Sequence, residues 1–216
     1  VPGEVEVKPE KSGFTDFGKI TEIPLEYMTL RQSAKTCGIS ISEGKLHIQG
    51  GNSLASKYNQ GLLARRHQHH SYDFTAKMEF DPGDYCHMAG IVCYYNYDNN
   101  YYLHMSVDDE GKTYVMLNVS VNKEITQGEK VYLQENGKPV YLKAEVRECD
   151  VTFFVSQDGI SYTQVGDVLD MRNLSDERVD GNGFTGAMVG VSCQDLHGDG
   201  VQADFDWVDY KVFKPL

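Results

Sequence analysis

The hydrophobic and polar residues of this chain alternate in many short runs, and the longest such pattern lies near its centre. Residues 88–107 (MAGIVCYYNYDNNYYLHMSV) hold two apolar, aromatic runs on either side of Tyr97-Asp98-Asn99-Asn100. Asn and Asp tolerate the backbone conformations of a tight reversal, so this stretch predicts a β-hairpin. Both runs are apolar at successive positions, which indicates that the hairpin lies inside a sheet whose two faces are both covered.

A pairing of Asn96 with Tyr101 across the turn would assign the hairpin side chains to two faces, because successive residues of a strand point to opposite sides. One face then has the composition of a hydrophobic core: Val92, Tyr94, Leu103 and Met105. The other face is aromatic but partly polar, and it collects Ile91, Cys93, Tyr95, Tyr102, His104 and Ser106. We interpret this second face as a wall that is shielded by another part of the chain, or that meets a partner or a ligand.

Shorter strands are predicted along the rest of the chain. Alternating or apolar runs occur at 45–49, 113–121, 140–146, 151–155 and 203–213, and turn signals such as Asp81-Pro82-Gly83-Asp84 separate the strand candidates. Only residues 169–178 resemble a helix, and no stretch keeps helical periodicity for three turns. This pattern indicates an all-β fold, a two-sheet antiparallel β-sandwich of the jelly-roll type. We expect one domain at 14–216, after a polar lead-in or linker at 1–13.

The charge and hydropathy of the chain argue against two classes of partner. The chain has 32 acidic and 20 basic side chains, a formal net charge of −12, and the acidic residues are scattered along it. Nucleic acids and anionic membranes are bound through basic surfaces, so we expect neither as a partner. No apolar run approaches the length of a membrane span.

The N-terminus and the cysteines bear on the cellular setting. Residues 1–13 (VPGEVEVKPEKSG) contain no apolar signal core and no initiator Met, so we expect a piece cut from a longer polypeptide. The cysteines are odd in number and form no C-x-x-C pair; they are Cys37, Cys86, Cys93, Cys149 and Cys193. We therefore expect free thiols in a reducing compartment, and hence a cytoplasmic location.

Two clusters of titratable residues could carry chemistry. The first is RRHQHH, in which His67 and His69 would share one face of a strand. We favour a hydrogen-bonded polar face over a metal site here, because no third metal ligand is visible nearby in the sequence. In the second, DFDWVD, Asp204 and Asp206 would share a face, and Asp209 would lie opposite unless a bulge intervenes. Paired carboxylates raise the hypothesis of an autonomous sandwich-fold glycan hydrolase, but the simpler interpretation is that they bond to loop amides or to a neighbouring Arg.

A third cluster surrounds the glycine-rich sequence QDLHGDG at 194–200. Asp195, Asp199 and Asp204 could gather carboxylate oxygens around Ca²⁺, which prefers such ligands. The EF-hand spacing is absent, and the sequence indicates no other cofactor.

Several short motifs carry a resemblance to a known family. They occur in this order: Leu63-Ala64-Arg65-Arg66-x-Gln68-His69, Phe80-x-Pro82, Met88-Ala89-Gly90, Tyr94-Tyr95-Asn96, Phe184-Thr185-Gly186-Ala187, Gln194-Asp195 and Ala203-Asp204-Phe205-Asp206. Together they resemble the C-terminal β-sandwich of the β-xylosidases and α-L-arabinofuranosidases of glycoside hydrolase family 43. The resemblance covers the chain from about Phe14 to its end, and it implies a concanavalin A-like sandwich.

The resemblance also implies an accessory role. In the family, the catalytic carboxylates lie on an N-terminal five-bladed propeller, which these 216 residues do not contain. A loop of the sandwich leans over the propeller's pocket and adds an aromatic side chain to the wall of the sugar site. The matching position in FDPGDYCHMAG is Tyr85, where the family usually has Phe, and the extra hydroxyl of Tyr would need a partner. The implied partners are the propeller and, indirectly, a xylooligosaccharide-type sugar.

Two alternatives come from other functional classes. The chain could be a free-standing carbohydrate-binding module with Tyr95, Tyr102 and His104 as a stacking platform, since aromatic rings stack on sugars. Arg66 and His69 are further candidates for contact with a sugar or with another domain. The second alternative is the autonomous hydrolase with its acids on the DFDWVD strand.

Overall fold

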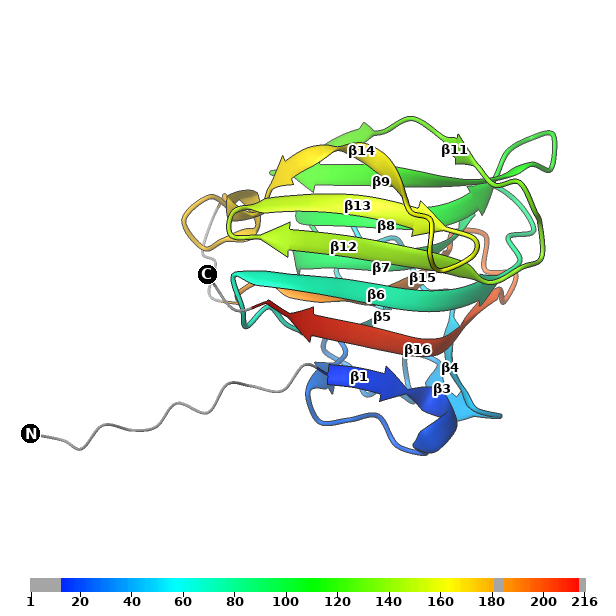
Figure 1. The fold of residues 1–216 in the computed structure, drawn as a ribbon. Helices are drawn as coiled ribbons and strands as arrows, with labels where there is room; N and C mark the ends of the chain where they lie inside the picture. The colour runs from blue at the N-terminus through cyan, green and yellow to red at the C-terminus, as the bar shows by residue number, and fades with distance from the viewer. Residues whose placement is uncertain (1–12, 181–184, 214–216) are drawn as a thin grey trace, which may run out of the picture.

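The computed structural model describes residues 13–180 and 185–213, which form two antiparallel sheets of eight strands each, packed face to face (Figure 1). The all-β sandwich predicted from the sequence is confirmed. The lead-in predicted at 1–13 lies outside the described residues except for Gly13, as does Phe184 of the FTGA motif. None of the helices in the described part of the chain is long and apolar enough to span a membrane.

Sheet A is the front sheet of Figure 1, and strands from both halves of the chain build it. Its order is β14 (Thr163–Asp170), β13 (Asp150–Ser156), β12 (Val140–Arg147), β6 (Ser71–Phe80), β16 (Gln202–Val212), β4 (Lys45–Gln49) and β3 (Ile39–Ser42), and β1 (Gly13–Asp16) also pairs with β16. Inward residues alternate with outward ones along β6 and β12, as a sheet with one face on a core requires. The predicted strands at 45–49 and 140–146 belong to this sheet.

Sheet B lies behind sheet A and contains the central hairpin. Its order is β10 (Glu124–Gln127), β9 (Thr113–Val121), β8 (Asn99–Val107), β7 (His87–Asn96), β15 (Met188–Asp195), β5 (Gly61–Arg66) and β2 (Tyr27–Met28), and β11 (Val131–Tyr132) also pairs with β9. Two short 3₁₀ helices complete the described elements, η1 (Phe17–Lys19) and η2 (Met171–Leu174). The second falls within the interval 169–178 that resembles a helix in sequence.

The register of the central hairpin corrects the predicted faces of β7. Asn96 pairs with Asn99 rather than Tyr101, and a bulge follows between Tyr94 and Asn96, so that Ile91 lies opposite Leu103. The tighter turn and the bulge move β7 relative to β8 by an odd number of positions, which exchanges the faces of a strand. Ile91, Cys93 and Tyr95 therefore point into the core between the sheets, and Val92 and Tyr94 point to the outer face.

The outer face of sheet B is buried as well, as the apolar composition of the hairpin predicts. A second hydrophobic cluster consists of Leu54, Leu62, Ala64, Val92, Tyr94 and Tyr102, with Leu30, Met88 and Met188 packed against it. Leu54 belongs to the segment between β4 and β5, and its backbone N–H donates to Gln194 Oε1 of β15 at 3.0 Å. The chain itself thus supplies the shield over this face.

All five cysteines have free thiols. Cys93 and Cys193 are buried among apolar side chains, and burial raises the pKa of the Cys93 thiol to about 12. Cys149 is exposed at the reversal between β12 and β13.

We expect thiol titration of the denatured chain, purified without reductant, to return five thiols per molecule. The physical reason is that all five cysteines are free thiols in the fold and that Cys93 and Cys193 are buried, where they are shielded from oxidants. A count of three or one would mean that one or two disulfides form, and it would contradict this arrangement.

Candidate functional site

The loop between β6 and β7 presents Tyr85 to solvent. Pro82 is buried, whereas the Tyr85 side chain is 59% exposed. Two hydrogen bonds span Tyr85: Asp84 Oδ1 accepts the backbone N–H of Cys86 at 2.6 Å, and the backbone N–H of His87 donates to the carbonyl of Asp84 at 3.2 Å. The ring is therefore carried by a turn whose backbone is hydrogen-bonded on both sides of it.

A second loop, between β15 and β16, is organised by one carboxylate. Asp195 accepts backbone N–H groups from four residues of this loop, at 2.6 Å from Gly198, 2.7 Å from Gly200, 3.1 Å from His197 and 3.3 Å from Val201. Burial raises the pKa of Asp195, but the amide donors outweigh burial and lower it to about 2. The carboxylate stays ionised, and it acts as the anchor of the loop.

The two loops touch beside Tyr85. His197 Nδ1 lies 2.7 Å from Asp84 Oδ2, and the backbone N–H of Leu196 donates to the carbonyl of Cys86 at 3.2 Å. The ring of His197 packs edge-on to Tyr85, with 6.4 Å between ring centroids. Tyr85 thus stands on a surface made by both loops.

The predicted stacking platform is not exposed, which corrects the interpretation of three residues. Tyr95 lies in the core between the sheets and donates its hydroxyl to the carboxylate of Asp176. Tyr102 and His104 lie on the opposite face of sheet B, stacked with centroids 5.0 Å apart, and each is at most 2% exposed. A sugar cannot stack on any of the three, because the register puts them on two buried faces.

The other two predicted contact residues lie nearer the surface. Arg66 is exposed and donates from Nη1 to the carbonyl of Gly186 at 3.3 Å. His69 is half-buried, with Nδ1 3.2 Å from the hydroxyl of Tyr210. The neighbouring His67 makes a similar contact with Tyr72 at 3.4 Å, as the hypothesis of a hydrogen-bonded polar face predicts.

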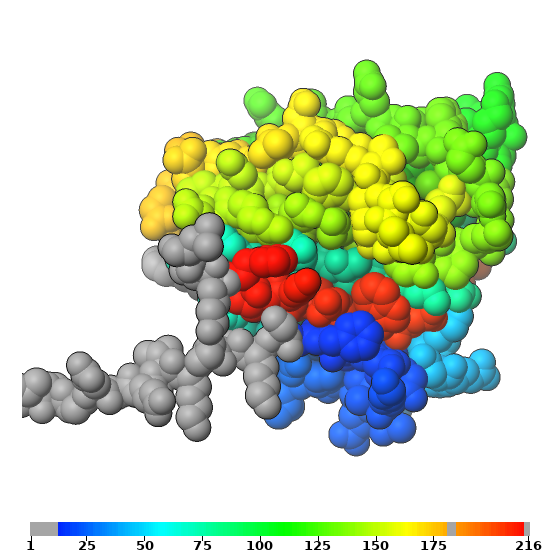
Figure 2. Space-filling view, viewed as in Figure 1, coloured from blue at the N-terminus to red at the C-terminus, as the bar shows by residue number. Residues whose placement is uncertain are grey.

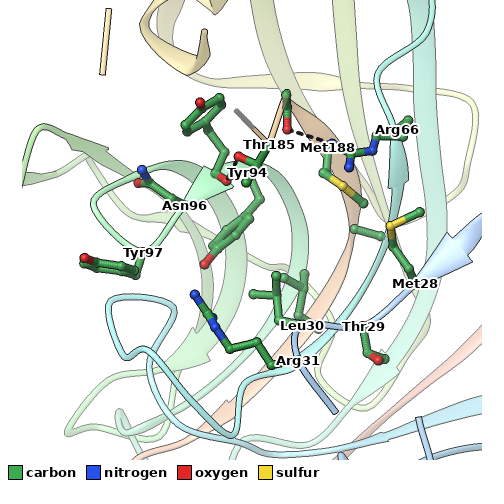
Figure 3. A pocket seen from close by; sticks show the side chains of 14 residues that line it. Met28, Thr29, Leu30, Arg31, Arg66, Tyr94, Asn96, Tyr97, Thr185 and Met188 are labelled. Atoms are coloured by element: carbon green, nitrogen blue, oxygen red, sulfur yellow. Dashed lines mark hydrogen bonds between the residues drawn. The ribbon is translucent and has the colours of Figure 1, made fainter. Parts of the chain in front are cut away.

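A pocket of about 160 Å³ on the outer face of sheet B was not predicted from the sequence (Figure 3). Its lining includes the apolar residues Leu62, Ala64 and Met188 and the basic residues Arg31 and Arg66. Figure 3 shows Arg31 pointing toward Tyr94. The pocket lies over the C-terminal end of β7, where Tyr94, Tyr95 and Asn96 line it together with Tyr97 of the following turn. Tyr85 precedes the other end of β7, so most of the strand's ten residues, at about 3.3 Å each, lie between the two features. The pocket and the Tyr85 loop are separate features.

Two of the three acidic residues of the DFDWVD strand are paired with basic residues. Asp206 lies 2.5 Å from Lys77 and 3.6 Å from Lys45, and Asp204 accepts from His47 Nδ1 at 2.7 Å. A bulge lies between Phe205 and Trp207, and it returns Asp209 to the outward face. The sequence predicted that Asp209 would share this face with Asp204 and Asp206 only if such a bulge were present. Figure 2 shows β16 at the surface of sheet A beside β1, where Phe14 packs on Trp207 with centroids 5.5 Å apart.

The three calcium candidates do not form one group. The oxygens of Asp195 accept backbone amides, Asp204 pairs with His47, and Asp199 lies 3.7 Å from His87 Nε2. Within the described ranges, the groups of residues that could hold a metal ion lie around Asp84 instead: Asp84, Cys86 and His197, and Asp84, His87 and Asp199. Sequence reasoning missed them because the members come from two loops far apart in the chain.

These features define a two-sheet β-sandwich domain that carries an exposed aromatic side chain on paired loops at one end. The family described as the β-xylosidase C-terminal concanavalin A-like domain matches residues 15–211. The chain therefore belongs to this family.

Curated relatives and solved structures agree with the family. The chain is 30% identical over 208 residues to a β-xylosidase of Bacillus subtilis and 32% identical over 185 residues to xylosidase/arabinosidase 43B of Humicola insolens. These matches cover 94% and 81% of the chain but only 38% and 33% of the relatives. A xylan β-1,4-xylosidase of Bacillus halodurans superposes with a TM-score of 0.89 at 29% identity, over 97% of the chain and 41% of that structure. The chain thus spans little more than a third of the proteins that it matches.

We expect buried histidines to make the fold acid-sensitive. Burial lowers the pKa of His104 from 6.5 to about 4, so this group stabilises the fold fully above pH 6.5 and loses that contribution as the pH falls toward 4. Between pH 7 and pH 5, the free energy of unfolding should fall by about 2 kcal/mol on this account. In His104→Gln, urea denaturation at the two pH values should give a correspondingly smaller difference. An unchanged difference would contradict a neutral buried His104.

We also expect no hydrolysis of aryl xylosides or arabinosides by the isolated chain. Asp204 and Asp206 on β16 are held in ion pairs, so they are not free to act as the acid and the nucleophile of a glycosidase. The measurement is release of the aryl alcohol by purified chain. Turnover that disappears in Asp206→Asn would overturn this expectation and support the autonomous hydrolase.

Proposed function

We propose that this chain is the non-catalytic C-terminal domain of a β-xylosidase-like glycoside hydrolase, in which it stabilises an N-terminal catalytic propeller and helps to close the sugar pocket. The observation that carries the proposal is the placement of Tyr85: a large aromatic side chain, 59% exposed, on a loop whose backbone is hydrogen-bonded on both sides of the ring. An aromatic ring offers a large apolar contact area at low conformational cost, which suits the wall of a sugar pocket.

Two further observations support a partner domain that carries the catalytic acids. The chain corresponds to 32–38% of the length of its curated relatives, which leaves room for a catalytic region in a longer protein. Asp204 and Asp206 of β16 pair with His47, Lys45 and Lys77, so they serve the sheet rather than a reaction. A glycosidase needs two carboxyl groups placed on either side of a glycosidic bond, and this surface offers no such arrangement.

The proposed substrate of the complete enzyme is a xylooligosaccharide or a related xyloside. The relatives include a β-xylosidase, a xylan 1,3-β-xylosidase and a xylosidase/arabinosidase, and we extend their xylosidase activity to the complete enzyme. Five free thiols favour a reducing compartment, so we place the enzyme in the cytoplasm. The negative net charge disfavours nucleic acid and anionic membrane as partners.

One observation keeps a carbohydrate-binding module as the second candidate. Arg66, a predicted contact residue, lines the same pocket as Tyr94 and Tyr97 (Figure 3), and aromatic and guanidinium groups recur in sugar sites. The pocket is at the far end of β7 from Tyr85, so this candidate does not use the same surface.

Substitution of Tyr85 tests the proposed function. In the isolated chain, we expect Tyr85→Ala to change the free energy of unfolding by less than about 0.5 kcal/mol, because the side chain is mostly exposed. In the enzyme that joins this chain to its catalytic region, the same change should lower kcat/KM for an aryl xyloside by more than it lowers stability, since a wall that excludes water and orients the sugar is lost. The measurements are urea denaturation and steady-state kinetics.

Two control variants sharpen this test. Tyr85→Phe keeps the ring and should retain most of the activity, while Tyr132→Ala removes another exposed aromatic, on β11, and should leave kcat/KM unchanged. If Tyr85→Ala unfolds the chain, or leaves the kinetics of the intact enzyme untouched, the proposed role of Tyr85 is wrong. A dissociation constant tighter than about 1 μM for a xylooligosaccharide on the isolated chain would support the free-standing module instead.

A further inference from the structure

The register of sheet B brings metal-ligating side chains from two loops to one place beneath Tyr85. In the pairing of β7 with β15, His87 lies opposite Asp195, and these residues close the two strands at the same end of the sheet. The loop that precedes His87 carries Asp84 and Cys86, and the loop that follows Asp195 carries His197 and Asp199. Each loop therefore contributes two side chains with ligand atoms.

Distances place three of these ligand atoms within reach of a single ion, and the fourth lies close by. One atom from each of Asp84, Cys86 and His197 lies within 4.8 Å of the others, and His197 Nδ1 is 2.7 Å from Asp84 Oδ2. The fourth side chain, Asp199, has Oδ2 4.0 Å from His197 Nδ1. Ligand atoms in a tetrahedral zinc site are on the order of 3–4 Å apart, so small side-chain movements suffice to form such a site.

A buried, unpartnered nitrogen points at this cluster. His87 is 5% exposed, and its Nε2 has no hydrogen-bond partner. Because the N–H of Gly83 donates to His87 Nδ1 at 3.1 Å, the proton of the neutral ring is on Nε2, which lies 3.5 Å from Asp195 and 3.7 Å from Asp199. A buried donor left unsatisfied is costly, and histidine N–H groups commonly orient carboxylates that bind metals. His87 is placed to hold Asp199 in this way.

The charge around the cluster also favours a cation. Asp84, Asp195 and Asp199 bring three carboxylates together, and the basic side chains found within 4.0 Å of them among the described residues are the histidines His87 and His197. The carboxylates are therefore not neutralised by Lys or Arg in these contacts. A divalent ion would offset this negative charge at short range.

We propose that the loops at 84–87 and 195–199 form a zinc-binding site, with Asp84, Cys86 and His197 as ligands, Asp199 as the fourth, and His87 as the residue that orients Asp199. One thiolate, one imidazole and two carboxylates suit Zn²⁺ or a similar transition metal and not Ca²⁺, which takes only oxygen ligands. Binding releases the thiol proton of Cys86 to solvent as the S–Zn bond forms.

The position of the site gives it a consequence for Tyr85. Asp84 and Cys86 are its immediate neighbours in the chain, and His197 packs against its ring. Zinc would hold the backbone on both sides of the aromatic side chain. Only this effect on the sugar pocket rests on the proposed function; metal binding itself is a property of the 216-residue chain.

Metal titration of the isolated chain tests the proposal. We expect one Zn²⁺ per chain with a dissociation constant below about 10 μM by calorimetry, and no competition from millimolar Ca²⁺. Co²⁺ in place of Zn²⁺ should give the charge-transfer absorption of a thiolate ligand. Cys86→Ser should abolish that absorption and weaken Zn²⁺ binding at least tenfold, and His197→Gln should weaken it to a similar degree. Cys149→Ser, which removes an exposed thiol elsewhere, should change neither result.

A second measurement requires no variant. Saturating Zn²⁺ should slow alkylation of Cys86 by iodoacetamide in the native chain, as read by peptide mass spectrometry, and should leave Cys149 as reactive as before. Any one of three outcomes would overturn the site. The first is that no stoichiometric Zn²⁺ binding is found at concentrations below about 100 μM. The others are that the affinity for Zn²⁺ is unchanged in both Cys86→Ser and His197→Gln, or that Zn²⁺ does not protect Cys86 from alkylation. None of these outcomes depends on a catalytic region, so failure here is distinct from failure of the role proposed for Tyr85.

Discussion

The burial of sheet B on both faces is the constraint on which the other features of this domain depend. Ile91 and Leu103 face sheet A, while Val92 and Tyr102 lie under the segments that cover the outer face. A slip of one residue between β7 and β8 would exchange two packed sets of side chains, so the register is strongly specified. The backbones also approach closely: a Cβ atom on Gly190 would lie 2.2 Å from the carbonyl oxygen of Leu63. The central strands therefore have little freedom to shift.

A fixed register places the strand ends, and the strand ends place the loops. Because His87 is opposite Asp195, the β6–β7 and β15–β16 loops leave the sheet together, and Asp84 meets His197 across a separation of 113 residues. Asp195 then folds the second loop by accepting amides from four of its residues. The position of Tyr85 thus follows from burial in the sheet through a short series of hydrogen bonds, with little contribution from the ring itself.

The sequence was informative where a signal is local. The alternation at 140–146 predicts both the strand and its inward residues, because Leu142, Ala144 and Val146 are fully buried. It failed for the faces of β7, because a turn that is shorter than expected and a bulge at Tyr94 leave no mark in the hydrophobic pattern of a strand that is apolar on both sides. The exposed aromatic at Tyr85 was foreseen through the family motif and the turn signal at Pro82.

The cluster around Asp84 and the pocket beside Arg66 were not foreseen, since each is assembled from segments that only the sheet topology brings together. Local patterns also gave a misleading impression of the acidic strand. Asp204 and Asp206 share a face as the spacing predicts, but cross-strand neighbours on β4 and β6 decide their role by supplying His47, Lys45 and Lys77. The register between strands determines which side chains lie next to an acidic pair, and the sequence of the pair alone does not.

Exposure alone does not distinguish Tyr85, because single apolar residues on a surface are ordinary and Leu25 is fully exposed. Leu25 also lies in a hydrogen-bonded turn, in which the N–H of Tyr27 donates to the carbonyl of Pro24 at 3.0 Å. What sets Tyr85 apart from Leu25 is the additional attachment of its turn to a second loop. Its neighbours Asp84 and Cys86 are hydrogen-bonded to each other, and each is also bonded to the β15–β16 loop. A side chain whose backbone is already ordered loses less conformational entropy when it meets a partner, so more of its contact energy remains for binding. An aromatic residue that is both exposed and held in place is suited to act as a wall for a ligand carried by another domain.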